Sequence, residues 1–319
     1  MLTYSQPPVL LRDAIGDLDA VVGLLERNAP YTPLGGWYRN VGDPNAVTSP
    51  LWFQNDWVHA DLAVEGSNLF MCDERVIEAA RNFYGAEVIV PHSLYVNIMA
   101  AISESGPAHT DNPMFRGRSR ANTPMWLLRA MLWSGLFDRW SIVQATAIWW
   151  MNDVEGGGLS YWPDGPAKPP HRHAGDMANT SLVGDNHGMF HQVEPVGPFE
   201  AGTQLVTAAA ELAPTDDGSG DWTVTDRGEV VYRAPLGRFR VSVLWKASVY
   251  RTEEERRSVE CDTLSLDDVA RIFDAALAER GVDFRFDLDR LDAPELNRAL
   301  AEVYPEAVPI GAGRSVFDA

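Results

Sequence analysis

The sequence predicts a mainly β protein with flanking helices, of the sandwich or jelly-roll type. Many short runs with strand-like alternation follow one another between residues 86 and 250, with glycine and proline between them. Both ends of the chain instead carry apolar residues at helical spacing. The chain has 319 residues, 45% of them apolar, which is enough to bury a substantial core. We therefore expect a single domain over 1–319, with a helical N-terminal part (1–85), a jelly-roll core (86–250) and a helical C-terminal part (251–319).

Two helices are expected in the N-terminal part. Residues 13–28 place apolar side chains at helical spacing, with Asp13 ahead of them as a candidate N-cap. Residues 74–84 form a second helical pattern. It ends at Gly85, because glycine readily adopts the left-handed conformation that follows many helices.

The core is predicted from seven strand-like stretches, one of which reads as a hairpin. Each is rich in β-branched or aromatic residues and is bounded by turn residues. The stretches are 87–102, 142–153, 180–185, 189–196, 202–212, the hairpin 221–234, and 237–250.

Helices return in the C-terminal part. Ser265 is the expected N-cap of a helix that ends at Gly281, and Asp268 at the third helical position completes a capping box. A shorter helix is expected from Asp292, as its cap, to Val303.

Charge and cysteine content exclude several functional classes. A formal net charge of −19 disfavours a nucleic-acid partner, which requires a basic face. The two cysteines, Cys72 and Cys261, have neither the spacing of a structural zinc site nor that of a disulfide framework. No leader pattern or membrane-length apolar run is visible, so we expect a cytoplasmic protein without a membrane partner.

A histidine and an aspartate stand two residues apart in the stretch PAHTDNP. In a strand, or at its exit, residues i and i+2 point to the same side, so His109 and Asp111 can direct an imidazole and a carboxylate at one point. An isolated pair of this kind also arises by chance. A third ligand is needed before it indicates a metal site.

His191 in the strand-like stretch MFHQVEPV is the candidate third ligand. Strand alternation turns it toward a partly apolar interior. Two histidines and one carboxylate form the facial triad that binds Fe(II) and leaves coordination positions open. The alternative interpretation is a hydrogen-bonded core histidine.

Other histidines compete for the same role. His187 remains an alternative distal ligand, although HGMFH lacks the glutamate of a zinc protease helix. His171 and His173 form an HxH pair resembling a cupin ligand pair, but the prolines before it favour a loop.

Four motifs in order resemble the Fe(II)/2-oxoglutarate-dependent dioxygenases with their double-stranded β-helix. The resemblance covers about residues 90–250. The motifs are HTD (109–111), WWMNDVEGGGLSYWPDG (149–165), HQVEPV (191–196) and RVS (240–242). It implies that His109, Asp111 and His191 hold Fe(II), that 2-oxoglutarate and O₂ are cosubstrates, and that Arg240 with Ser242 binds the distal carboxylate of 2-oxoglutarate.

The chain departs from the family pattern in one respect. Arg240 follows His191 by 49 residues (191 to 240), whereas typical members join these two strands directly. We interpret the intervening residues, which include the expected hairpin, as an insertion. Arg238 is then the close alternative anchor and Arg233 a remote one, and an edge strand with solvated arginines is the non-functional interpretation.

Candidate substrate contacts come from one basic segment and one aromatic pair. Arg116, Arg118 and Arg120 cluster after the HxD pair and could form a lid for an anionic substrate or an ordinary solvated loop. Trp149 is the candidate aromatic wall of a pocket, although most tryptophans serve packing. We expect a small organic substrate.

The resemblance implies an oxidoreductase that couples decarboxylation of 2-oxoglutarate to oxidation of the substrate. Hydroxylation, in secondary or amino-acid metabolism, is the foremost expectation, and desaturation, ring closure and epimerisation are variants of the same chemistry. Asp111 disfavours a halogenase, in which a small residue replaces the carboxylate. The alternatives are a cupin-type metal-dependent isomerase or lyase and a metal-free β-sandwich binding module.

Overall fold

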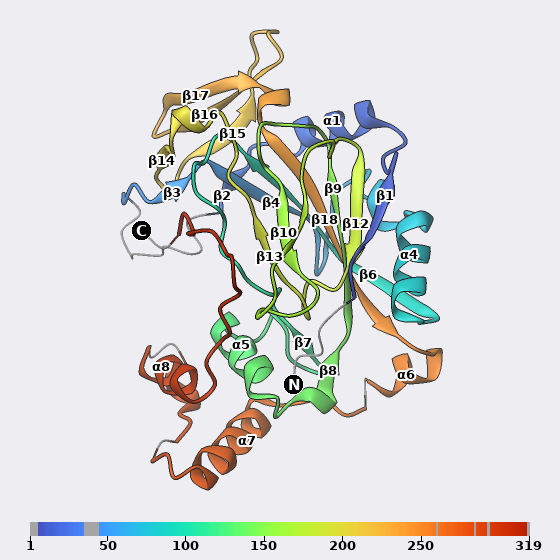
Figure 1. The fold of residues 1–319 in the computed structure, drawn as a ribbon, viewed down its shortest axis with the longest axis vertical. Helices are drawn as coiled ribbons and strands as arrows, with labels where there is room; N and C mark the ends of the chain where they lie inside the picture. Colours follow the sequence, from blue (N-terminus) through green and yellow to red (C-terminus); the bar gives the residue numbers. More distant parts are fainter. Residues whose placement is uncertain (1–5, 35–44, 260, 284, 292–293, 318–319) are drawn as a thin grey trace.

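Eight strands form one large antiparallel sheet at the centre of the protein (Figure 1). The structure is a computed structural model and describes residues 6–34, 45–259, 261–283, 285–291 and 294–317. In spatial order the strands are β1 (Val9–Arg12), β12 (Thr180–Gly184), β9 (Gln144–Trp150), β18 (Arg240–Tyr250), β6 (Val88–Met99), β4 (Trp52–His59) and β2 (Thr32–Pro33), with β5 (Leu62–Ala63) beside β4.

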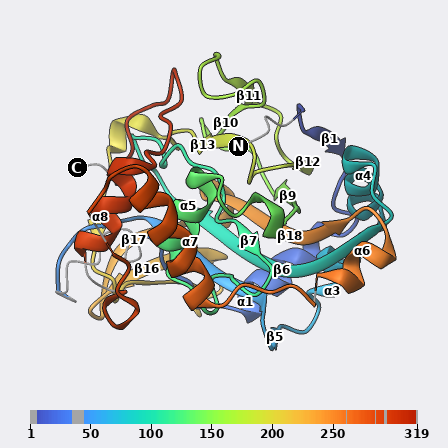
Figure 2. The same ribbon diagram turned by 90° about the horizontal axis from the view of Figure 1, so that it is seen from below.

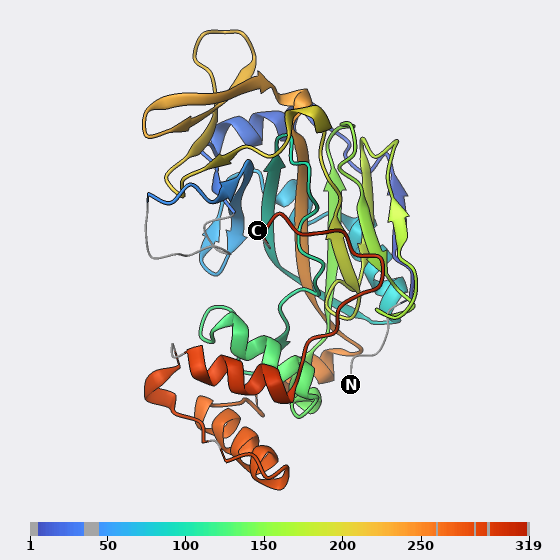
Figure 3. The same ribbon diagram turned by 60° about the vertical axis from the view of Figure 1, so that its left-hand side comes forward.

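A small sheet faces the large one (Figure 3). It consists of β11 (His171–His173), β10 (Leu159–Trp162) and β13 (Phe190–Val193). Single bridges from Ile102 to Val196 and from His109 to His191 extend this sheet along the segment that carries the HxD pair.

Strands that follow one another along the chain alternate between the two sheets. From β6 the chain crosses to the HxD segment, returns in β9, crosses to β10 and β11, returns in β12, crosses to β13 and returns in β18. This winding is that of a jelly roll. The expected fold class, mainly β with flanking helices, is therefore confirmed.

Three N-terminal helices cover the outer face of the large sheet. They are α1 (Leu18–Arg27), α3 (Asn68–Met71) and α4 (Glu74–Tyr84). Their apolar residues join the largest core cluster, in which Trp149 of β9 meets Phe70 edge to face with ring centroids 5.0 Å apart. Because side chains alternate along a strand, Ile148 and Trp150 point instead to the inner face, toward the small sheet.

The helix ends largely follow the sequence signals. Gly85 closes α4 in the left-handed conformation with φ 59°. The cap of α1 differs from the expected one: Asp17, and not Asp13, accepts a hydrogen bond from the Ala20 amide, at 2.9 Å. Asp13 lies four residues too early and adopts a φ of 47°.

A second apolar cluster lies at one end of the molecule (Figure 2). It joins α5 (Met125–Ser134), α7 (Leu266–Glu279) and α8 (Pro294–Val303), while α6 (Glu253–Ser258) lies apart from them. The capping box of Ser265 and Asp268 is present on α7. The expected cap Asp292 lies outside the described residues. Helix α5 was not expected, because its segment reads as a basic loop.

The residues between β13 and β18 form a separate three-stranded sheet. Its strands are β15 (Glu211–Pro214), β16 (Asp221–Asp226) and β17 (Glu229–Pro235). Strands β16 and β17 are the expected hairpin. The long interval between His191 and Arg240 therefore holds added structure that leaves β18 in the large sheet.

Smaller elements complete the fold. They are the pair β3 (Ser49–Pro50) and β14 (Leu205–Val206), the pair β7 (Met114–Phe115) and β8 (Ser141–Ile142), and the 3-10 turns η1 (Asp138–Trp140), η2 (Phe199–Ala201), η3 (Leu236–Arg238) and η4 (Leu288–Arg290). No helix among the described residues has the length and apolar character needed to cross a membrane.

The N-terminal part is not wholly helical, contrary to expectation. Strand β4 pairs with β6 over most of its length, and β1 pairs with β12 at the sheet edge. Strand β4 carries the stretch WFQNDWVH, whose aromatic residues favour a strand buried in a sheet.

The C-terminal segment 305–317 returns from α8 along the two sheets (Figure 3). The amide of Ile310 donates to the carbonyl of Pro166 at 2.8 Å, and that of Val316 donates to the carbonyl of Ser105 at 2.8 Å. The segment thereby reaches the stretch between β6 and the HxD pair.

We expect Trp149→Ala to lower the free energy of unfolding by about 3 to 5 kcal/mol, because it leaves a cavity beneath the helices. Trp149→Phe should cost much less, since it keeps most of the packing volume. Urea unfolding followed by circular dichroism measures both losses. A loss below about 1 kcal/mol in the alanine variant would contradict the core position of Trp149.

Candidate metal centre

Backbone pairing places two histidines opposite each other. The amide of His109 donates to the carbonyl of His191 at 3.0 Å, and the amide of His191 donates to that of His109 at 2.9 Å. The ring centroids consequently lie 4.4 Å apart. Asp111 is fixed just beyond, because its amide donates to the carbonyl of Asn186 at 2.7 Å.

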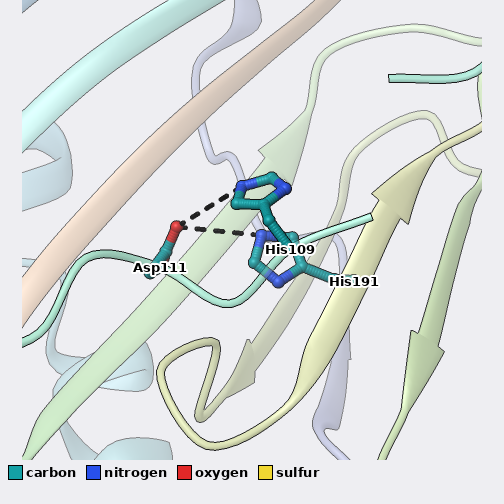
Figure 4. Close-up of side chains that lie close together, drawn as sticks. All are labelled: His109, Asp111 and His191. Atoms are coloured by element: carbon teal, nitrogen blue, oxygen red, sulfur yellow. Dashed lines mark ion pairs between the residues drawn. The ribbon is translucent and has the colours of Figure 1, made fainter. Parts of the chain in front are cut away.

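The carboxylate of Asp111 faces both imidazoles (Figure 4). Its Oδ1 lies 3.9 Å from Nε2 of His109 and 3.7 Å from Nε2 of His191. The three ligand atoms lie within 4.8 Å of one another. Asp111 and His191 are buried, while the His109 side chain remains 30% exposed.

Hydrogen bonds select the ring nitrogens that are available to a metal. Nδ1 of His109 lies 2.8 Å from the carbonyl of Pro107, and Nδ1 of His191 lies 3.3 Å from that of Met189. A carbonyl only accepts, so Nδ1 carries the proton in each ring and the lone pair of Nε2 is directed toward Asp111.

The charge states suit the same role. Burial lowers the pKa of His109 to about 4, and burial also lowers the pKa of His191. Both rings are therefore neutral near pH 7 and can donate electron pairs. Two neutral imidazoles and one carboxylate, each imidazole held by a backbone carbonyl, fit a divalent ion such as Fe(II).

Lys246 belongs to the site and was not anticipated. Its Nζ lies 3.0 Å from Oδ2 of Asp111, the oxygen that does not face the histidines. Burial alone would raise the pKa of Asp111, but the charge of Lys246 brings it well below its usual value. Strand alternation could have indicated this residue, because it puts Lys246 on the same face of β18 as Arg240.

Arg240 is a buried cation on the same face of β18. Its Nε donates to the carbonyl of Gly157 at 2.6 Å, and its Nη1 donates to Oγ of Ser242 at 3.0 Å. Burial lowers its pKa to about 10, against the charge of Glu194. Within the described chain no carboxylate lies at ion-pairing distance from this guanidinium.

The glycine-rich turn explains how Arg240 is held. Gly157 has a φ of 68°, and a Cβ there would lie 3.0 Å from Cδ of Arg240. A residue without a side chain is thus needed for the carbonyl of Gly157 to reach the guanidinium. The turn and the arginine, 83 residues apart in sequence, form one unit.

The alternative arginines lie elsewhere. Arg238 is exposed on η3, before β18 begins, so it does not share a strand face with Arg240. Arg233 pairs with Asp217 and Asp221 in the added sheet, at 2.7 and 2.8 Å.

A cavity of about 920 Å³ connects the metal-ligand cluster with Arg240. Its volume lies in the range of sites that bind small organic molecules. The large sheet supplies Ser242, Leu244 and Lys246, and the C-terminal segment supplies another wall.

The competing histidines occupy other positions. His187 is buried near Asp111, and neither ring nitrogen has a hydrogen-bond partner among the described residues, but it lies outside the cluster of three ligand atoms. Burial lowers its pKa to about 3. His171 and His173 lie on β11, where Nε2 of His171 meets Asp164 at 3.4 Å and Nε2 of His173 meets Oγ1 of Thr180 at 3.0 Å.

Only one of the four candidate substrate residues lines the cavity. Arg120 lines the cavity, whereas Arg116 and Arg118 do not. Arg116 pairs with Asp262 at 3.1 Å. The expectation that Trp149 lines the pocket is wrong. Side chains alternate along β9, so Trp149 points into the core and its neighbour Ile148 points into the cavity.

Arg129 of α5 is a further cavity residue that was not anticipated. Its Nη1 donates to the carbonyl of Thr110 at 3.0 Å, and its guanidinium pairs with Glu306. Arg129 thereby connects the loop between His109 and Asp111 to the C-terminal segment. It was missed because α5 was not expected.

No protein-family model and no curated protein matches the sequence. The structure is similar to an oxidoreductase of the 2OG-Fe(II) oxygenase family from Burkholderia pseudomallei, with 14% identity over 76% of this chain and 85% of that one and a TM-score of 0.42. It is also similar to a prolyl-4-hydroxylase from Pseudomonas putida, with 12% identity over 78% and 94% of the chains and a TM-score of 0.38. The non-heme alpha-ketoglutarate-dependent epimerase SnoN of nogalamycin biosynthesis is similar at 11% identity over 76% and 77%, with a TM-score of 0.40.

We expect His109→Ala, Asp111→Ala and His191→Ala each to abolish Fe(II) binding, because each removes one ligand atom. The two histidine variants remove little core volume and should retain the fold, whereas Asp111→Ala should also lower the Tm because it leaves the buried Lys246 without its ion pair. Anaerobic equilibrium dialysis measures binding, and circular dichroism measures folding. His187→Ala is the matched control and should bind Fe(II) normally. Binding by His191→Ala together with loss in His187→Ala would transfer the distal position to His187.

We expect Lys246→Met to destabilise the metal-free protein, because breaking a buried ion pair from one side costs about 3 to 5 kcal/mol. A divalent ion at the three ligands would replace the lost positive charge. Mn(II) should therefore raise the Tm of this variant by more than it raises that of the wild type.

Lys168→Met is the control for this experiment, since Lys168 is exposed and is the only other lysine of the sequence. It should respond to Mn(II) as the wild type does. An equal Mn(II) shift in Lys246→Met would show that Lys246 and the metal do not act on the same carboxylate.

Proposed function

We propose that the protein is a non-haem Fe(II)- and 2-oxoglutarate-dependent oxygenase that hydroxylates a small organic substrate. The observation that carries this proposal is one cavity with two features. It holds two histidines and one carboxylate at a common point, and it contains a buried arginine without a carboxylate partner among the described residues.

His109, Asp111 and His191 would hold the iron. The backbone bonds of the two histidine rings keep the Nε2 atoms directed at Oδ1 of Asp111. Lys246 occupies Oδ2, so Asp111 offers one oxygen to a metal and other coordination positions stay open. When bound, Fe(II) with 2-oxoglutarate and O₂ supplies the oxidising chemistry that couples decarboxylation of the cosubstrate to oxidation of a C–H bond.

Arg240 would bind the distal carboxylate of 2-oxoglutarate. A guanidinium forms two parallel hydrogen bonds with a carboxylate, and the carbonyl of Gly157 fixes the plane of this one. The Ser242 hydroxyl accepts from Nη1 of Arg240 and keeps its own proton to donate to the same carboxylate.

The buried arginine favours this function over the alternatives. A cupin-type isomerase or lyase acts without an anionic cosubstrate and has no need of Arg240, whose burial without a counter-charge is unfavourable in the absence of a ligand. A metal-free binding module would need neither the ligand cluster nor the ion pair of Asp111 with Lys246.

The direct test is formation of succinate from 2-oxoglutarate. With Fe(II) and O₂ the wild type should release succinate even without its organic substrate, at a slow uncoupled rate. Asp111→Ala should release none. Equal succinate formation by wild type and Asp111→Ala would overturn the proposal.

We expect Arg240→Ala to weaken 2-oxoglutarate binding by at least about thirtyfold, because losing one partner of a buried charge pair costs about 2 kcal/mol or more. Calorimetry with Mn(II) in place of Fe(II) measures the Kd. Arg240→Lys should recover part of the loss, since lysine keeps the charge but cannot form the two parallel hydrogen bonds of a guanidinium. Affinity for Mn(II) should remain nearly unchanged.

Arg238→Ala is the matched control two residues away, on the exposed turn η3. It should bind 2-oxoglutarate as the wild type does. A large loss in Arg238→Ala with none in Arg240→Ala would reverse the assignment.

A further inference from the structure

The cavity has a charge opposite to that of the whole protein. Five of its lining residues are basic and two, Asp111 and Glu306, are acidic, whereas the whole chain has 26 basic and 45 acidic residues. The basic residues are Arg120, Arg129, Arg240, Lys246 and Arg314. Under the proposed function, a divalent metal adds two positive charges and the two carboxylates of 2-oxoglutarate cancel them. The loaded cavity therefore keeps its positive excess.

The excess is localised once the ion pairs are assigned. Lys246 pairs with Asp111, and Arg129 pairs with Glu306. Arg240 is buried beside Ser242 at the position proposed for the cosubstrate. Arg314 remains, exposed on the cavity wall.

Arg314 is held in place by its backbone. The amide of Ser105 donates to the carbonyl of Arg314 at 3.2 Å. Its neighbour Gly313 exchanges two hydrogen bonds with the side chain of Gln192, each of 2.8 Å, and Gln192 adjoins the ligand His191. The side chain of Arg314 has no hydrogen-bond or ion-pair partner within the described residues. It is thus a cation without a counter-charge, on a backbone fixed relative to the metal ligands.

Apolar side chains line the cavity as well. Val308 and Pro309 of the C-terminal segment line it together with Met125 of α5. Val308 is 83% exposed, so a ligand that covered it would remove apolar surface from water. A charged contact and an apolar contact are therefore available to one molecule.

We propose that the organic substrate is an anion with an apolar body, bound by its acidic group at Arg314 and by its body along Met125, Val308 and Pro309. The inference rests on the proposed function, since it assigns the substrate class of the same cavity. A carboxylate and a phosphate ester share the required chemistry, because either forms charge-assisted hydrogen bonds with a guanidinium. A polyanion is disfavoured, since its further charges would meet the net charge of −19 on the rest of the protein.

The test compares three probes of equal chain length: octanoate, octyl phosphate and the neutral octanamide. Calorimetry is performed on protein loaded with Mn(II) and saturated with 2-oxoglutarate, so that the cosubstrate position is occupied. One or both anions should bind more tightly than octanamide, and the tighter of the two identifies the acidic group. Arg314→Gln should weaken anion binding by at least about tenfold and leave octanamide unaffected.

Arg257→Gln is the matched control, because Arg257 is an exposed arginine of α6 outside the cavity. Its anion binding should equal that of the wild type. Octanamide binding as tight as that of the anions, no anion binding at millimolar concentration, or no effect of Arg314→Gln would each overturn the inference.

The same titrations separate this inference from the proposed function. Loss of anion selectivity in a protein that still binds Mn(II) and 2-oxoglutarate would overturn only the substrate class. Conversely, the protein could bind neither Mn(II) nor 2-oxoglutarate and still bind anions in a manner that depends on Arg314. That result would overturn the proposed oxygenase function and would support the anion-binding site.

Discussion

The pairing of His109 with His191 is the interaction on which the site depends. Two backbone hydrogen bonds, of 3.0 and 2.9 Å, join segments that are more than eighty residues apart and place two imidazoles on one side of the small sheet. Asp111 follows two residues later and turns its carboxylate toward both rings. The jelly-roll winding matters to function because it makes these two segments neighbours. The added sheet between β13 and β18 leaves this pairing intact.

Buried charge is the second constraint on the structure. Asp111 and Arg240 are both buried in the sheet region, where an isolated charge is costly. Asp111 is compensated by Lys246 on one oxygen, which leaves the other oxygen for a metal. Among the described residues Arg240 has only neutral acceptors, namely the carbonyl of Gly157, the hydroxyl of Ser242 and the sulfur of Met99. Arg240 lacks an anionic partner, which the carboxylate of a cosubstrate would supply. Asp111 faces two neutral imidazoles, and a metal ion bound between them would supply the missing positive charge.

Much of the fold could be predicted because its signals are local. Strand alternation located β6, β9, β13 and β18, and capping residues located α4 and α7. The signals failed where tertiary packing decides. Helix α5, MWLLRAMLWS, is apolar on nearly every side, so its periodicity is weak, and it is stabilised by packing against α8 and the other residues of that cluster. Strands β10 and β11 have four and three residues, too few for a reliable pattern.

The candidate site shows the same division. Residue type, spacing and order singled out the three ligand positions and Arg240, and these residues line one cavity. Trp149 was assigned to the wrong face of β9. Which face of this strand is covered depends on where the N-terminal helices pack, and the local sequence does not determine that. Lys246 could have been found by extending the alternation of β18 from Arg240, but its ion pair with Asp111 depends on the fold. Arg129 and Arg314 come from α5 and the C-terminal segment, and no local pattern connects either to the ligands.

The most direct test of the central claim is an anaerobic titration of the wild-type protein with Fe(II) and then 2-oxoglutarate, followed by visible absorption. The site described here predicts a weak charge-transfer band that requires both additions, saturates at one equivalent of each and is absent from His191→Ala. A protein that shows no band with both present, or a band that persists in His191→Ala, would contradict the claim that His109, Asp111 and His191 form an Fe(II) centre which binds 2-oxoglutarate.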